Sequence, residues 1–455
     1  MTNLSSKLAQ LEDDGKPIQI AIIGAGKFRS MFSSQSHRTA GMRIAAIADL
    51  SPERALAALE RTGYPEERYD ATLTKSIKEG IECGQTIITK DASAMIASPG
   101  IDVVLEMTGN PVAGVKHALL CCEHKKHIVM INVEAGVLAG PLLTRKAKEA
   151  GIKYSMAYGD QPALIAELVD WARTAGLISL FDTGYCLGLL RVYKRTTCTG
   201  DFNPQMFNSF LDGTKSALEM AAVANGCGLK PPNHGLRFPP CGAHDLPEVL
   251  KPRSDGGQLE RKGTVEVVSC LELDGRPVFN DLRWGVYVII EADQKQHLAS
   301  IKKTASSTSI MCRGEPTGQK KMWAADVVAT AERDLKAGEM LDGEGGFTVY
   351  GKLMTSADSL AIEGLPIGLA HGFVLNTDLK KDQRLSWADV EFDATSSAVG
   401  FRREMETKFR KEMDPSSCAN GHAKSENLRN FLQSVHTTKC IHGLLPSTTN
   451  HHLTG

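Results

Sequence analysis

Residues 20–32 read IAIIGAGKFRSMF, and this stretch decides the fold of the N-terminal region. An apolar run ends at Gly24-Ala25-Gly26, and a helical pattern begins directly after the second glycine. In such a turn the first glycine permits a tight bend, and the second lets backbone N–H groups approach a phosphate. Asp49 ends the next apolar run, at the spacing where an acidic residue that binds ribose is expected. The stretch therefore predicts a dinucleotide-binding turn in a Rossmann-type domain, and an ordinary glycine-rich strand–helix turn is the simpler alternative.

Arg29 occupies the position of the third glycine of this fingerprint. That glycine mainly permits close packing of helix against strand, so we expect Arg29 to strain the packing while cofactor binding survives. The alternative is that Arg29 reaches the phosphate oxygens, because a guanidinium binds phosphate through paired hydrogen bonds. Lys27 and Phe28, which precede it, are predicted to border the same cofactor.

Apolar runs alternate with helical patterns from residue 15 to residue 175. Such alternation requires crossover connections and therefore predicts a parallel, doubly wound α/β sheet. The runs are continuous, as in IDVVLEM at residues 101–107, which suits strands that are buried on both faces. The predicted strands are 18–23, 42–48, 102–107, 127–132 and 152–155.

Polar clusters follow two more of these strands, Thr108-Gly109-Asn110 and Asn132-Val133-Glu134. Ligands of open α/β sheets bind outside the carboxyl ends of the strands, so we expect both clusters to border nicotinamide and substrate. Helix capping by Thr108 or Asn110 explains the first cluster equally well. The choice of cofactor stays open, because Asp49 favours the free ribose of NAD whereas Arg54 could pair with the 2′-phosphate of NADP.

The middle of the chain, residues 176–325, is predicted to be a mixed α+β domain. Its stretch NPQMFNSFLDGTKSALEMAAVAN has Asn208, Asp212, Lys215 and Glu219 at helical spacings, so we expect them on one face of a single helix. A solvated polar face is the commoner explanation of such spacing. Farther along, TVEVVSCLEL and WGVYVIIEA flank an Asp-Gly turn and predict antiparallel strands.

An internal repeat marks a predicted β-rich module at residues 326–395. DLKAGEML begins at Asp334 and recurs loosely as DLKKDQRL from Asp378, which predicts two similar turn units. Residues 406–455 are rich in Ser, Thr, His and Asn and predict a mostly disordered tail, with one short helical candidate at 426–435.

Composition narrows the range of partners. The 455 residues carry 52 Lys+Arg against 53 Asp+Glu, with no basic run, so we expect a small-molecule substrate and no nucleic acid. The 11 cysteines include no Cys-x-x-Cys pair, and neither a signal peptide nor a membrane-spanning run is evident, which predicts a cytoplasmic protein. No metal is expected at two Cys/His groups whose spacing is not that of zinc ligands: Cys121, Cys122, His124 and His127, and His234, Cys241 and His244.

Several long stretches carry a closer resemblance, among them DVVLEMTGNPVAG, YSMAYGDQPALIAELVDWA, NPQMFNSFLDGTKSALEMAAVAN and GEGGFTVYGKLM. They resemble deoxyxylulose-phosphate reductoisomerase-like (DRL) oxidoreductases, relatives of homoserine dehydrogenase that carry a C-terminal SAF domain. The resemblance covers about residues 15 to 406 apart from two stretches. It implies a Rossmann domain, a catalytic domain and a small SAF (β-clip-like) module. It also implies a chemistry of isoprenoid precursor synthesis in which a deoxyxylulose phosphate, or a similar phosphorylated keto-sugar or carbonyl compound, is rearranged and then reduced by NADPH or NADH.

The same resemblance implies roles for individual residues. Lys215 suits the electrophile that hydride transfer requires at the carbonyl oxygen, and Asp212 orients Lys215 or relays protons. Glu134 takes part in acid–base chemistry or holds a divalent ion, although Gly136 stands where the family's acidic residue is expected. Substrate contacts are implied for Asn132, Asp160, Gln161, Asn208 and Ser209, with helix capping as the alternative for Asp160.

Two stretches, 177–201 and 292–311, depart from the family pattern. Pieces of the catalytic domain could therefore be missing, so one alternative is a degenerate homologue that binds nucleotide or a partner without turnover. A homoserine-dehydrogenase-like enzyme is another alternative, against which Glu134 counts because it stands near the position of that family's lysine. Enzymes of this architecture are often symmetric, so we expect a homodimer.

Overall fold

The structure is a computed structural model that describes residues 4–24, 26–69, 75–174, 179–187, 204–283, 285–291 and 322–413. Among the residues predicted to border the cofactor, the side chains of Lys27, Phe28 and Arg29 lie outside this description. The chain divides into two units, Met1–Glu406 and Thr407–Gly455, and the contacts of the fold and of the site lie within the first. Over the described ranges, no helix is both long and apolar enough to cross a membrane.

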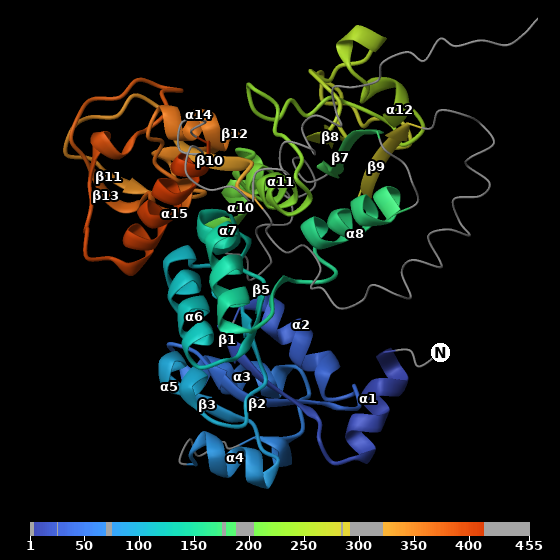
Figure 1. The fold of residues 1–455 in the computed structure, drawn as a ribbon, viewed down its shortest axis with the longest axis vertical. Helices are drawn as coiled ribbons and strands as arrows, with labels where there is room; N and C mark the ends of the chain where they lie inside the picture. The colour runs from blue at the N-terminus through green and yellow to red at the C-terminus, as the bar shows by residue number, and fades with distance from the viewer. Residues whose placement is uncertain are drawn as a thin grey trace, which may run out of the picture. The chain divides into compact units, whose positions relative to one another are not determined.

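Six parallel strands form the N-terminal sheet in the order β3-β2-β1-β4-β5-β6 (Figure 1). The chain order reverses between β1 and β4, which is the arrangement of the dinucleotide-binding fold. The predicted doubly wound parallel sheet is therefore confirmed, and β1 and β2 begin and end at the predicted residues. The strands are β1 Ile18–Ile23, β2 Met42–Ala48, β3 Ile87–Thr89, β4 Val103–Glu106, β5 His127–Met130 and β6 Tyr154–Met156.

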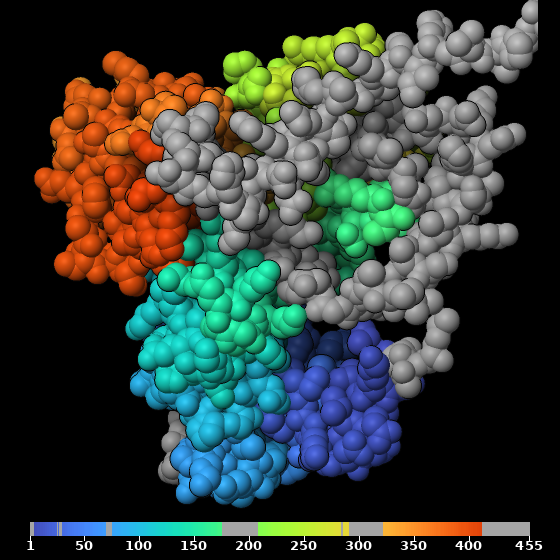
Figure 2. Space-filling model, in the orientation of Figure 1, coloured from blue at the N-terminus to red at the C-terminus, as the bar shows by residue number. Residues whose placement is uncertain are grey.

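Helices cover this sheet in two layers. Helix α2 packs beside α3, whereas α5, α6 and α7 pack against one another in turn (Figure 1). On the face shown in Figure 2, the atoms of this domain, coloured blue to teal, form one closely packed body. Isoleucines of β1 and β2 pack with Ala55 and Leu59 of α3 in its core, as the continuous apolar strands require. The helices are α1 Leu4–Asp13, α2 Lys27–Ser36, α3 Pro52–Arg61, α4 Ile77–Cys83, α5 Ala92–Ala97, α6 Pro111–Glu123 and α7 Val133–Ala150.

The middle domain contains a three-stranded sheet in the order β8-β7-β9. Strand β7 is parallel to β8 and antiparallel to β9, so β8 and β9 run in opposite directions as predicted but are not neighbours. The strand between them, β7, lies in the stretch 177–201 that departs from the family pattern. The elements are α8 Gln161–Thr174, β7 Ser179–Leu187, α10 Pro204–Leu211, α11 Thr214–Cys227, α12 Leu246–Val249, β8 Thr264–Ser269 and β9 Val286–Glu291.

The single helix predicted over residues 207–224 is in fact two helices, α10 and α11. Gly213 separates them with a φ of +80°, a left-handed conformation that glycine adopts without strain. Asp212 accepts a hydrogen bond from the N–H of Thr214 at 2.8 Å and so holds the first residue of α11. The prediction that Asn208, Asp212 and Lys215 share one face of a continuous helix is therefore wrong.

The two copies of the C-terminal repeat pair with each other. Leu335 and Leu379 exchange backbone hydrogen bonds of 2.9 and 3.0 Å. Two ion pairs follow the same reciprocal pattern, Lys336–Asp378 at 2.7 Å and Lys380–Asp334 at 2.8 Å. The two copies of the sequence repeat therefore make equivalent, reciprocal contacts with each other. The elements of this region are β10 Ala325–Ala331, β11 Met340–Asp342, β12 Val349–Thr355, α14 Ser356–Ala361, β13 His371–Leu375 and β14 Val390–Glu391.

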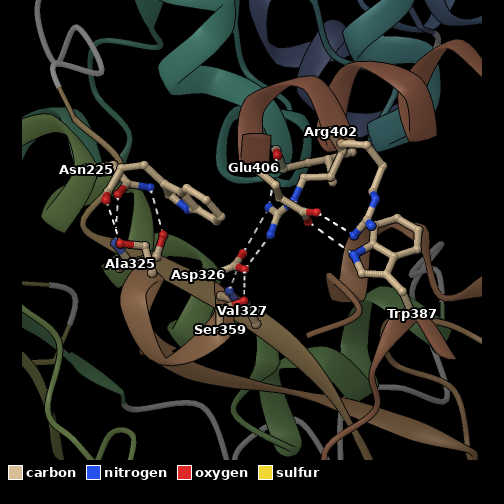
Figure 3. Close-up of polar contacts among 12 residues, drawn as sticks. Asn225, Ala325, Asp326, Val327, Ser359, Trp387, Arg402 and Glu406 are labelled. Carbon is tan, nitrogen blue, oxygen red and sulfur yellow. Dashed lines mark hydrogen bonds and ion pairs between the residues drawn. The ribbon is translucent and has the colours of Figure 1, made fainter. Parts of the chain in front are cut away.

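Helix α15, Ser397–Met413, is anchored by the fully buried side chain of Arg402 (Figure 3). The guanidinium donates hydrogen bonds to both carboxylate oxygens of Asp326 in β10 and to Glu406 one turn later. It also donates to the backbone carbonyl of Leu138 in α7 at 3.2 Å. Residue 406, the predicted start of the tail, therefore lies inside a helix with a buried ion pair. Residues 414–455, with the helical candidate at 426–435, lie outside the described part.

Candidate active site

A buried ion pair joins the Rossmann domain to the middle domain. Lys215, in the first turn of α11, donates a hydrogen bond of 2.7 Å to Oε1 of Glu134. Glu134 lies in the first turn of α7, directly after the carboxyl end of β5. The side chains of Lys215 and Glu134 are only 13% and 5% exposed. The structure thus brings together two of the three residues that the resemblance implied to be catalytic.

More carboxylates surround this pair. Burial alone would lower the pKa of Lys215, but the charges of Glu134, Glu219 and Glu344 outweigh it and raise that pKa above its usual value. Lys215 is therefore a cation at neutral pH. Burial raises the pKa of Asp160, and the nearby charge of Lys215 opposes the rise. Asp160 also accepts the N–H of Gln161, the first residue of α8, at 3.1 Å, and it lies close enough to Lys215 and Glu134 for both charges to affect its pKa.

Asp212, the third residue implied to be catalytic, lies at the link between α10 and α11. Its Oδ1 accepts a hydrogen bond from the N–H of Thr214. Burial raises the pKa of the Asp212 carboxyl, although its hydrogen bonds with Thr214 oppose the rise. Its Oδ2 has no hydrogen-bond partner among the residues that the structure describes. The Thr214 hydroxyl accepts the N–H of Gly351 in β12 at 2.7 Å, which ties the start of α11 to the C-terminal region. Asp212 thus positions the helix that carries Lys215.

Glu344 is a site residue that reasoning from the sequence missed. It lies in the loop between β11 and β12, and its carboxylate is hydrogen-bonded to Ser209 of α10. Asn208 donates to the carbonyl of Gly345 in the same loop at 3.1 Å. Asn208 and Ser209, implied to bind substrate, therefore hold this loop in place. The available signal was an acidic residue flanked by glycines within GEGGFTVYGKLM.

The loops that follow β4 and β5 are joined by side-chain hydrogen bonds. Asn110 caps α6 at 2.9 Å, as the capping alternative predicted, and Asn132 caps α7 at 3.0 Å. Asn132 also donates to the carbonyl of Asn110 at 2.9 Å, and it is only 2% exposed. The Thr108 hydroxyl donates to the buried carboxylate of Glu106 at 2.6 Å. These bonds fix the shape of the loop in which Gly109 lies with open space at its Cβ position.

The turn after β1 fits a dinucleotide phosphate. Gly24 has a φ of +106°, and a Cβ there would lie 2.9 Å from the carbonyl oxygen of Met107. Among the side chains that the structure describes, none caps α2 at its N-cap residue Gly26. An uncapped helix N-terminus offers N–H groups and favourable partial charge to an anion. Four other helices that follow strands of this sheet are capped by side chains: α3 by Ser51, α5 by Asp91, α6 by Asn110 and α7 by Asn132.

Asp49 completes this edge of the sheet at the end of β2. Its half-buried carboxylate accepts the N–H of Ser51 at 2.9 Å. The carboxylate therefore lies at the carboxyl edge of the strand beside β1, where a bound ribose would need it. Within the described ranges, no three His, Cys, Asp or Glu side chains are arranged to hold a metal ion.

A doubly wound sheet whose strand order reverses beside a glycine turn after β1 is the architecture of dinucleotide-binding domains. Residues 159–312 match the family model described as oxidoreductase DRL, catalytic domain. Over these residues the chain is similar to the catalytic domain of DRL oxidoreductases. The matched region includes Asp160 and Lys215, and it leaves out Glu134 and Glu344.

Solved structures resemble the chain more distantly. An oxidoreductase from Agrobacterium radiobacter in complex with NAD+, L-tartaric acid and magnesium is 17% identical, with 39% of this chain and 46% of that one covered and a TM-score of 0.26. An NAD-binding protein from Listeria innocua is 17% identical, with 38% and 45% covered and a TM-score of 0.26. DOX-P reductoisomerase in complex with magnesium is 15% identical, with 64% and 70% covered and a TM-score of 0.34. The chain thus spans less than half of the first two proteins, and no curated protein matches it.

Proposed function

We propose that the chain is an NADPH-dependent oxidoreductase that reduces the carbonyl group of a small phosphorylated keto-sugar, as DRL enzymes of isoprenoid precursor synthesis do. NADH is the alternative cofactor. One observation carries the proposal: the buried ion pair of Lys215 and Glu134 lies at the carboxyl end of β5, on the edge of the sheet where dinucleotide folds bind their ligands. The family match over residues 159–312 supports the same class of reaction.

In this proposal Lys215 is the electrophile. Negative charge develops on the carbonyl oxygen as the carbonyl carbon is reduced, and a fixed ammonium in a dry site stabilises that charge more strongly than water does. Glu134 accepts a hydrogen bond from one of the three N–H groups of the Lys215 ammonium and so fixes the orientation of that ammonium. The other N–H groups remain as donors for a substrate oxygen. A nicotinamide held by the Gly24 turn and Asp49 would supply the hydride.

Three further assignments belong to the same proposal. Residues 326–395 form a SAF-type module, which the pairing of the two repeats supports. The protein is a homodimer in a reducing, cytoplasmic compartment, in keeping with the architecture and with the cysteine pattern. We place no divalent ion on Glu134, because its Oε1 accepts the bond from Lys215.

Purified full-length protein tests the proposal in two stages. Calorimetric titration with NADPH and with NADH measures cofactor binding, and a panel of keto-sugar phosphates is then screened by the loss of nicotinamide absorbance. We expect binding of at least one cofactor and reduction of at least one compound of the panel. Binding of neither cofactor would overturn the dinucleotide site, whereas binding without any turnover would favour the degenerate homologue.

A further inference from the structure

The loop between β11 and β12 has a tightly determined shape. It reads GEGGF at residues 343–347, and Gly343 and Gly345 have left-handed φ angles of +75° and +69°. A Cβ on Gly346 would lie 2.1 Å from the carboxyl carbon of Asp342. The Asp342 carboxylate accepts the N–H groups of the two residues after the last glycine at 2.6 and 3.0 Å. The loop therefore needs its glycines, and its shape fixes where Glu344 is presented.

Glu344 lies close enough to the Lys215–Glu134 pair for the charges of both residues to affect its pKa. Its side chain is half-buried and hydrogen-bonded to Ser209, and its Oε1 is shielded from solvent and has no hydrogen-bond partner in the described part of the chain. A buried polar atom without a partner is unfavourable and requires a reason, which in an active site is commonly a functional one. The charged groups that face Glu344 are Lys215 on α11, Glu134 on α7 and Asp212 in the link between α10 and α11.

We propose that Glu344 is the proton reserve of this site, a carboxylic acid that returns to Lys215 the proton that Lys215 gives to the substrate oxygen. The inference rests on the proposed function. Reduction adds a hydride, supplied by the nicotinamide, to the carbonyl carbon, and a proton from Lys215 to the carbonyl oxygen. The carboxyl proton of Glu344 then moves to the neutral Lys215 amine. The resulting Glu344 carboxylate then takes up one proton from the bulk solvent, so that each turnover consumes one solvent proton and both groups are restored.

The electrostatics of the cluster agree with this role. Burial, together with the charge of Glu134, raises the pKa of Glu344 to about 8, although Lys215 and the Ser209 hydroxyl oppose the rise. Glu344 therefore carries a proton near neutral pH. Transfer from Glu344 to a neutral Lys215 is downhill, because the surrounding carboxylates raise the pKa of Lys215 despite its burial. Glu134 is less suited to the role, since its Oε1 already accepts a bond from Lys215.

Infrared spectroscopy of the full chain without cofactor tests the protonation directly. We expect a carboxylic-acid C=O band that Glu344→Gln removes and that disappears from the wild type with a midpoint near pH 8. The difference between the two proteins isolates Glu344, because burial also raises the pKa of Asp160, Asp212 and Glu266. Glu391→Gln, which changes an exposed glutamate on β14, is the matched control and should leave the band intact. Absence of a Glu344-dependent band would overturn the proposal.

Ser209→Ala provides a second test if Glu344→Gln does not fold. The Ser209 hydroxyl stabilises the Glu344 carboxylate, so its removal should raise the pKa and shift the infrared midpoint to higher pH; an unmoved midpoint would count against the assignment.

Turnover gives an independent measurement. Glu344→Gln should lower kcat about tenfold at unchanged KM and remove the decline in rate above the wild-type midpoint. An unchanged pH profile would overturn the proton role even if the band is present. If the wild type shows the band but reduces no compound of the panel, the proposed function fails and the proton role fails with it. If the enzyme is active but lacks the Glu344-dependent infrared band, the proton role of Glu344 is overturned while the proposed function stands.

Discussion

Two buried cations in this protein lie among carboxylates, and they differ in how fully their neighbours are hydrogen-bonded. Around Arg402 every carboxylate oxygen has a partner. Both oxygens of Asp326 accept from Arg402 and from one further group each, the N–H of Val327 and the hydroxyl of Ser359 (Figure 3). Glu406 accepts from Arg402 and from neighbouring side chains at both of its oxygens.

Around Lys215 the pattern is different. The ammonium has its bond to Glu134, while Glu344 Oε1 and Asp212 Oδ2 have no partner among the described residues. A fully bonded cluster can only hold the fold, because any change of ligand or protonation would break a bond. A cluster with unused acceptors can exchange protons and receive a ligand. From this comparison we expect a structural role for Arg402 and a catalytic role for Lys215. Each of the predictions below tests that difference.

The largest effect is expected at Arg402. Arg402→Met leaves the carboxylates of Asp326 and Glu406 buried without their cation, which should lower the free energy of unfolding by about 3–5 kcal/mol. Arg403→Met is the matched control, because the Arg403 side chain is 42% exposed and its ion pair should contribute less than about 1 kcal/mol. Urea unfolding of the three proteins measures both values. Similar losses for the two variants would contradict the structural role.

Lys215→Met should mainly affect turnover. Loss of the group that stabilises the developing oxyanion should lower kcat by about 10²–10³-fold. The melting temperature should fall less than in Arg402→Met, because the carboxyls around Lys215 can take up protons and become neutral. Lys116→Met, at an exposed position on α6, controls for the loss of a lysine. Retained turnover, or a loss of stability equal to that of Arg402→Met, would return Lys215 to a structural role.

Glu266 in β8 is a buried carboxylate in a third kind of environment, with backbone donors in place of a cation. Its Oε1 accepts the N–H groups of Arg237, Phe238 and Val267. Burial nevertheless raises the pKa of Glu266 to about 7, against the opposing effect of these bonds. Because folding raises this pKa, the protonated form is favoured in the native state. The associated stability is present below the unfolded pKa and is lost as the pH rises through about 7.

Glu266→Gln keeps an acceptor oxygen and cannot ionise. At about pH 8 the variant should therefore be more stable than the wild type by about 1–3 kcal/mol, and the difference should vanish at acidic pH. Urea unfolding across this pH range measures the effect. A stability difference that does not depend on pH would show that Glu266 does not titrate in this window.

The smallest effect is expected on the affinity for the nicotinamide cofactor. If Asp49 binds the ribose, Asp49→Asn should weaken NADH binding about tenfold and leave NADPH binding unchanged or tighter, because the carboxylate repels a 2′-phosphate. Arg54→Ala is the opposite variant and should weaken NADPH binding alone. Calorimetric titration of both cofactors decides the preference. Equal losses for the two cofactors in either variant would mean that the residue does not read the 2′ position.

The Rossmann domain could be predicted closely because its signals are local. Each strand is a continuous apolar run, and the turn at Gly24 and Gly26 follows its strand directly, so β1 and β2 agree with the sequence to the residue. The middle sheet could not be read in the same way. Its central strand β7 pairs with β8 and β9 from farther along the chain, and hydrophobic periodicity contains no information on such partners.

The candidate site shows the same difference between local sequence signals and long-range contacts. Lys215 and Glu134 were found through motifs, yet only the structure shows that they are bonded. Glu344 was missed because it reaches the site through packing of the C-terminal region on α10. The break between α10 and α11 was available in the sequence, since a glycine at position 213 directly follows a capping aspartate, but the helical spacing of the polar residues outweighed it.

The bond from Arg402 to the Leu138 carbonyl has a consequence for the synthesis of the protein. The two residues are 264 positions apart, so at about 5–20 residues per second the ribosome needs roughly 10–50 s to make the second after the first. The Rossmann sheet is complete at residue 156 and can fold during that interval. Helix α7 gains its contact with Arg402 only after residue 402 has been synthesised. Glu134, at the start of α7, likewise gains its contact with Lys215 only after residue 215 has been synthesised. A nascent chain can therefore complete its parallel sheet well before Lys215 can reach Glu134.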